Sequence, residues 1–173
     1  MNRANTNLGQ LRESFRAVTD RLGQPIEDAI FDLVVILNAL KIPTVASCGG
    51  HENQGHEACP WISIYPDFPT DETKWWQDPV ALAKFTSESH LYYDHVAKLL
   101  VDFYHDRSVP NEQQITLEKE GEVGGFVLVC RFCIPNDNRF ARPSDPEKLA
   151  NSRAEFSIFT TFLTNLYLKQ ASE

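Results

Sequence analysis

Apolar residues recur every three or four positions in four stretches of the chain, which is the spacing of one face of an α-helix. The first stretch covers residues 8–22 and stops at Gly23, a residue type that commonly ends helices. The second is apolar on nearly all sides from residue 30 to residue 40, which predicts a buried helix. We expect this helix to start at Pro25, with acidic Glu27 and Asp28 at the positive end of its dipole.

Two longer helices are predicted further along the chain, and each has a proline at its start. One begins at Pro79 and carries a single apolar stripe as far as Asp106. The other begins at Pro146, is capped by Ser144 or Asp145, and keeps one apolar side along its length. Each of these helices is long enough to cover a sheet.

Four short segments between the helices have the β-branched and aromatic composition of strands. They cover residues 44–47, 61–65, 114–118 and 125–134, and a turn at Gly121 joins the last two into a predicted hairpin. The predicted element order is therefore α-α-β-β-α-β-β-α. This order favours the α+β class: one domain over residues 1–173, with a mainly antiparallel four-stranded sheet and helices packed on one of its faces.

Charge and composition narrow the classes of function. The net charge of −8 argues against a broad nucleic-acid interface, because phosphate binding depends on clustered lysines and arginines. Arg139, Arg142 and Arg153 lie around the start of the last predicted helix, and we expect ordinary surface charge there. No apolar run approaches the roughly 20 residues of a membrane span, and Met1 precedes polar residues rather than a secretory signal. We therefore expect a cytoplasmic protein that contacts no membrane.

The four cysteines are too few for a disulfide scaffold in a chain of 173 residues. In the cytoplasm they would stay reduced, and each would then be a thiol, a metal ligand or a core residue. Cys130 and Cys133 have the spacing of a ligand pair, but residues three apart on a strand point to opposite faces, which favours core thiols.

The predicted strand at residues 44–47 breaks into Ser47-Cys48-Gly49-Gly50-His51, where reactive side chains and flexible backbone coincide. Two adjacent glycines can adopt positive φ and let a ligand approach the backbone N–H groups closely. This loop is the candidate functional site, and its residues support three hypotheses.

In the first hypothesis Cys48 and His51 are catalytic, because a thiolate beside an imidazole is an activated nucleophile. A carboxylate from another segment would orient His51, and the sequence does not identify that residue. Such a protein would be a thiol-dependent hydrolase or transferase. The structural alternative is that Cys48 is a buried residue at the end of a strand and that His51 caps the turn.

The second hypothesis is a zinc site at Cys48, His51, His56 and Cys59, which place sulfur and nitrogen ligands within one loop. The gap between the two ligand pairs is shorter than in most structural zinc sites. Zinc would be structural if all four residues bind it, and catalytic if one position is left to water.

The third hypothesis, a binding site for a small molecule or an anion, is our first prediction of function. Gly49 and Gly50 would present backbone N–H groups to the ligand, while Ser47 and His51 add polar groups. Trp61 would line the pocket. The sequence identifies neither the ligand nor a reaction.

The helix, strand and loop around this site carry a family resemblance. The residues concerned lie between Ile26 and Ile62, and include Asn38, Thr44, Ser47, Cys48, Gly50 and His51. This run resembles the Ser-Cys-x-Gly-His proteins of bacteria and phages, whose function is unknown, so the resemblance implies no activity. Over the loop and its preceding helix it resembles more distantly the wybutosine-synthesis methyltransferase family, which has arginine where this chain has His51. Neither the RNA substrate nor the S-adenosylmethionine cofactor of that family is carried over.

Overall fold

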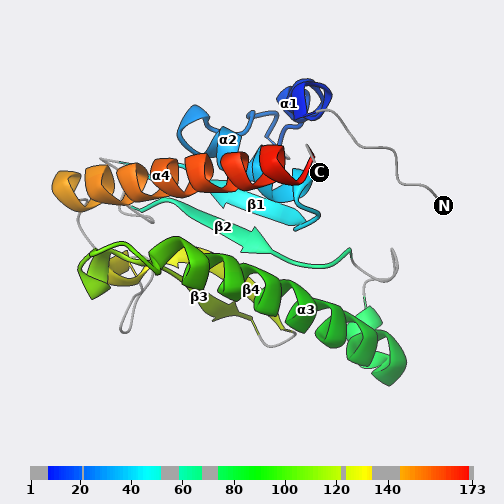
Figure 1. Ribbon diagram of the computed structural model, residues 1–173. Coiled ribbons are helices and arrows are strands. Elements are labelled where there is room, and N and C mark those ends of the chain that lie inside the picture. Colours follow the sequence, from blue (N-terminus) through cyan, green and yellow to red (C-terminus); the bar gives the residue numbers. More distant parts are fainter. Residues whose placement is uncertain are drawn as a thin grey trace.

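The computed structural model describes residues 8–20, 22–51, 59–67, 74–121, 124–133 and 145–171. These ranges contain four α-helices and four strands in the predicted order (Figure 1). The helices are α1 (Leu8–Arg16), α2 (Asp28–Ala39), α3 (Pro79–Tyr104) and α4 (Pro146–Gln170). The strands are β1 (Thr44–Cys48), β2 (Trp61–Ile64), β3 (Ile115–Glu120) and β4 (Gly125–Cys130). The predicted α+β class is confirmed.

The sheet has the strand order β1-β2-β4-β3, and each neighbouring pair is antiparallel. The predicted hairpin is formed by β3 and β4. The register places Ile62 beside Leu128 on the face that carries the core. It places Cys48 beside Trp61 on the opposite face, because successive side chains of a strand alternate between faces.

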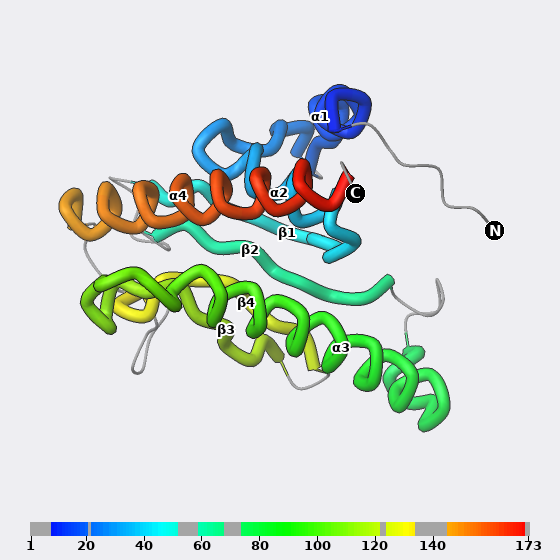
Figure 2. Tube along the Cα trace, viewed as in Figure 1, coloured from blue at the N-terminus to red at the C-terminus, as the bar shows by residue number. Residues whose placement is uncertain are grey.

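Helices α2, α3 and α4 contribute to one apolar core with the strands (Figures 1 and 2). Helix α2 contacts both β1 and α4, which explains why it is apolar on nearly all sides. The fully buried core residues include Leu33 and Leu37 of α2, Val96 of α3, Phe156 and Phe159 of α4, and Ile62 and Leu128 of the sheet. Across the described ranges, every helix is too short or too polar to span a bilayer.

The first helix is shorter than predicted, because α1 ends at Arg16 and not at Leu22. Directly after the helix, the N–H groups of Ala17 and Val18 bond to carbonyls three residues back, those of Ser14 and Phe15, which is a tighter turn than the α-helix. Further on, Asp20 Oδ1 accepts hydrogen bonds of 2.8 Å from the N–H groups of Leu22 and Gln24, and this local turn replaces the predicted last helical turn. Leu22 is 83% exposed, so it adds nothing to the apolar face of the helix.

Prolines mark two of the helix starts as predicted, at Pro79 and Pro146. The start of α4 is capped by Asp145, whose side chain accepts hydrogen bonds from two backbone N–H groups. Helix α2 instead begins at Asp28, because Pro25 lies in an isolated β-bridge before the helix.

A disulfide joins Cys59 and Cys133, so the prediction that all four cysteines are reduced is wrong. Strand β4 ends at Cys130, and the 3-10 turn Arg131–Cys133 brings its last residue close to the start of β2. The two Cα atoms of the disulfide are 6.1 Å apart, a usual separation for this bond. The core thiol predicted at Cys133 is therefore corrected, whereas Cys130 is a free and fully buried cysteine as expected.

Candidate functional site

Strand β1 returns from the end of helix α2 to its start. Asn38, near the end of the helix, donates a hydrogen bond of 2.8 Å to Thr44 Oγ1 at the start of the strand. A helix of 12 residues and a strand of five are both roughly 17 Å long. The loop after Cys48 therefore lies beside Glu27, the residue immediately before α2.

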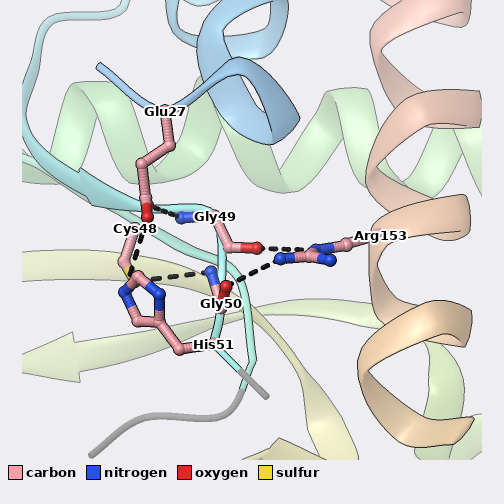
Figure 3. Close-up of polar contacts among 6 residues, drawn as sticks. All are labelled: Glu27, Cys48, Gly49, Gly50, His51 and Arg153. Atoms are coloured by element: carbon pink, nitrogen blue, oxygen red, sulfur yellow. Dashed lines mark hydrogen bonds and ion pairs between the residues drawn. The ribbon is translucent and has the colours of Figure 1, made fainter. Parts of the chain in front are cut away.

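Three potential metal-ligating side chains meet at this point: Glu27, Cys48 and His51 (Figure 3). Cys48 Sγ lies 3.3 Å from His51 Nε2, and Glu27 Oε1 lies 3.4 Å from the same nitrogen. The three ligand atoms all lie within 4.8 Å of one another. Cys48 is partly buried, and the side chains of Glu27 and His51 are 39% and 43% exposed, so the group is open to solvent on one side.

The two glycines hold the ligand residues through their backbone N–H groups. Gly49 N–H donates to Glu27 Oε2, and Gly50 N–H donates to Cys48 Sγ at 3.3 Å. Gly50 has a φ of 78°, a conformation that favours glycine. The anion site predicted at these N–H groups stays a prediction. Both N–H groups already donate to side chains, so an added anion would first have to displace Glu27 or Cys48.

Arg153 approaches the loop from helix α4, on the side away from the ligand residues (Figure 3). Its Nε donates to the carbonyl oxygen of Gly49 at 2.9 Å, and its Nη2 donates to the carbonyl oxygen of Gly50 at 2.7 Å. The positive charge of Arg153 is therefore directed at the backbone of the loop.

The other two predicted site residues neighbour Cys48 in the sheet but are not among the three potential ligands. Ser47 pairs with Ile62 on the core face of the sheet. Trp61 lies beside Cys48 in the strand register, and its buried indole nitrogen has no hydrogen-bond partner among the described residues.

The predicted four-residue zinc set is not assembled as expected. His56 lies outside the described residues. Cys59 is bonded to Cys133, and a disulfide sulfur is not a thiolate ligand. Cys48 and His51 remain together, and Glu27 takes a place that the sequence analysis did not assign.

The geometry of His51 separates nucleophilic catalysis from metal binding. In a catalytic triad the nucleophile and the orienting carboxylate bind different ring nitrogens of the histidine. Here Cys48 and Glu27 both approach Nε2. Donor atoms that converge on one point are instead the arrangement of ligands around a metal ion.

The roles of Glu27 and Arg153 differ from those expected from the sequence. Glu27 was expected to act as a charge at a helix end, but it caps no backbone N–H of α2 and reaches the loop instead. Arg153 was expected to be surface charge. The contact of Arg153 with Gly50 spans 103 positions of the chain, and no local pattern reports such a distance.

A second buried polar group lies between α3, α4 and β4. Glu155 is 7% exposed and forms an ion pair with Arg107, with 2.8 Å between Oε2 and Nη2. Burial, together with the negative charge of Glu155, raises the pKa of the Cys130 thiol to about 12. The same two causes, burial foremost, raise the pKa of Tyr104 well above its usual range. This group belongs to the core: the ion pair of Glu155 with Arg107 is buried there, and burial favours the neutral forms of Cys130 and Tyr104.

No family model matches this chain, and no significant match was found among curated proteins or solved structures. The resemblances given above therefore stay predictions. The site itself must carry the functional conclusion.

Proposed function

We propose that Glu27, Cys48 and His51 bind a divalent transition metal ion, with zinc preferred. The convergence of their donor atoms carries this proposal. Zinc bonds of about 2.3 Å to sulfur and about 2.1 Å to nitrogen and oxygen, at tetrahedral angles, separate sulfur from nitrogen by about 3.6 Å and nitrogen from oxygen by about 3.4 Å. The corresponding separations here are 3.3 Å and 3.4 Å.

Charge and ligand type favour the same ion. A thiolate and a carboxylate carry two negative charges, which balance a divalent cation when the imidazole is neutral. A set of one sulfur, one nitrogen and one oxygen suits zinc better than magnesium or calcium, which prefer oxygen alone. The hydrogen bond from Gly50 N–H further stabilises a thiolate at Cys48.

The described part of the chain adds no fourth histidine, cysteine or acidic residue to this group. A site with these three ligands alone would leave one tetrahedral position for water, as in hydrolytic zinc enzymes. The proposed class of reaction is therefore metal-assisted hydrolysis, on the exposed side of Glu27 and His51.

Cobalt titration of the metal-free protein tests metal binding, because cobalt replaces zinc and gives visible bands together with a sulfur-to-cobalt charge-transfer band. Cys48→Ser should abolish the charge-transfer band, and Glu27→Gln and His51→Gln should weaken binding. His105→Gln is the matched control, since that side chain is 78% exposed and lies outside the group. A folded wild-type protein without saturable binding would contradict the proposal.

The fourth position has a separate test. Azide or another small anion should change the cobalt bands if a water molecule completes the site. Unchanged bands at saturating azide would contradict an open position and leave a non-catalytic metal site.

A second candidate function is thiol-based catalysis, favoured by the 3.3 Å distance between Cys48 Sγ and His51 Nε2. In this case metal-free protein should alkylate rapidly at Cys48 near neutral pH, and His51→Gln should slow that reaction. Equal alkylation rates in the two proteins would exclude His51 as the base.

A further inference from the structure

One peptide unit connects Arg153 to the sulfur of Cys48. The carbonyl of Gly49 and the N–H of Gly50 belong to the same peptide bond. Its oxygen accepts from Arg153 Nε at 2.9 Å, and its N–H donates to Cys48 Sγ at 3.3 Å. A guanidinium on the oxygen draws electron density from the amide and makes its N–H a stronger donor.

The next peptide unit is held in the same way. Arg153 Nη2 donates to the carbonyl of Gly50, which directly precedes His51. One side chain therefore fixes the backbone between two of the ligand residues. Within the described ranges no carboxylate forms an ion pair with Arg153, so its charge is directed at these two carbonyls.

We infer that Arg153 is the positioning residue of the loop. It holds the Gly49–Gly50 peptide with its N–H towards Cys48 and thereby strengthens the cysteine as a metal ligand. The second part of this inference rests on the proposed metal function, whereas the first part holds for the metal-free protein as well. Residues that orient a ligand without touching the metal change metal affinity by about 10–100-fold when they are lost.

The first experiment uses metal-free protein, so that its result does not depend on the proposed function. Backbone amide exchange is measured by NMR in wild type and in Arg153→Met, which keeps a long side chain but removes every donor. The Gly50 N–H should exchange about tenfold faster in the variant, because a hydrogen bond supported by a charge is lost. Unchanged exchange at Gly50 in a folded variant would overturn the inference.

The second experiment measures zinc affinity and the sulfur-to-cobalt charge-transfer band in the same proteins. Arg153→Met should bind zinc about 10–100-fold more weakly and shift that band. Arg153→Lys keeps the charge and one donor, and should recover part of both effects. Lys148→Met is the matched control, because it removes a cation from the same helix outside the loop and should change neither.

The outcomes separate the two proposals. Wild type that binds no metal refutes the proposed function, while amide exchange still decides the role of Arg153. Wild type that binds zinc, with equal affinity and spectrum in Arg153→Met, overturns the inference and leaves the metal site intact. If Arg153→Met does not fold, the Arg153→Lys variant supplies the same comparison.

Discussion

Gly49→Ala would test how the loop holds Glu27 without changing any ligand residue. A Cβ at residue 49 would lie 3.1 Å from Ala29 Cβ, 3.2 Å from Glu27 Oε2 and 3.3 Å from Glu27 Cβ. All three separations are shorter than ordinary van der Waals contacts between side chains. Glu27 also accepts a hydrogen bond from Gly49 N–H, so the carboxylate cannot move away without losing that bond.

Two routes are open to the variant, and they have similar costs. Retaining the crowded arrangement costs about 1–3 kcal/mol of overpacking. Moving Glu27 away loses a hydrogen bond to a carboxylate, which contributes about 1.5–3 kcal/mol. We expect the free energy of unfolding to fall by about 1–3 kcal/mol. Zinc affinity should fall by about 10–100-fold or more, since loss of a residue that supports a metal ligand has an effect of that size.

Zinc affinity would be measured by competition with a chromophoric chelator, and stability by urea unfolding of the metal-free protein. Gly121→Ala is the control. Gly121 has a φ of 67°, and no described residue would lie within 4 Å of an added Cβ, so this variant should lose stability through backbone strain and keep its zinc affinity. A folded Gly49→Ala protein with wild-type zinc affinity would refute the account of how Glu27 is held.

Three further predictions concern the core and the disulfide. Glu155→Ala leaves Arg107 without its buried partner and should lower the free energy of unfolding, measured in urea, by about 3 kcal/mol. A loss below about 1 kcal/mol would show that the ion pair is solvated. Because the pKa of Cys130 is raised from 9.0 to about 12, the unfolded thiol ionises first; stability should be complete below pH 9 and fall by about 1.4 kcal/mol per pH unit above it. Cys130→Ala should remove the loss between pH 9 and pH 10, below the range in which the raised pKa of Tyr104 contributes, and an identical slope in urea unfolding over that range would count against it. Reducing the Cys59–Cys133 disulfide, which spans 74 positions, should lower the free energy of unfolding by about 4 kcal/mol. The Tm should therefore fall when a phosphine reductant is added, and an unchanged Tm in the reduced protein would contradict this.

The fold could be predicted largely from local patterns. Pro79 and Pro146 begin their helices as expected, because a proline at the first helical position fits the backbone and lacks an N–H that would stay unpaired. The end of α1 could not be predicted from periodicity, since the chain after Arg16 turns through short backbone bonds and the side chain of Asp20 then accepts from the N–H groups of Leu22 and Gln24. Local hydrogen bonds of this kind compete with an apolar pattern without changing it.

The candidate site could be predicted only in part. The glycines and the nearby cysteine and histidine mark the loop in the sequence, and Cys48 and His51 do lie together. Glu27 and Arg153 reach the loop through the packing of α2 and α4, which a linear pattern does not reveal. The disulfide of Cys59 has the same origin, because the pairing of β2 with β4 brings distant segments together.

Metal content is the most direct test of the central claim, that Glu27, Cys48 and His51 form a metal site. Protein purified without added metal would be analysed by elemental mass spectrometry, alongside titration of its native thiols. In the native fold Cys48 is the accessible thiol, because Cys130 is buried and the other two cysteines are bonded. The account predicts about one zinc per chain, with Cys48 protected until a chelator removes the metal. Folded protein that holds no zinc, even after zinc is supplied, and whose Cys48 reacts at the same rate with and without zinc, would contradict it.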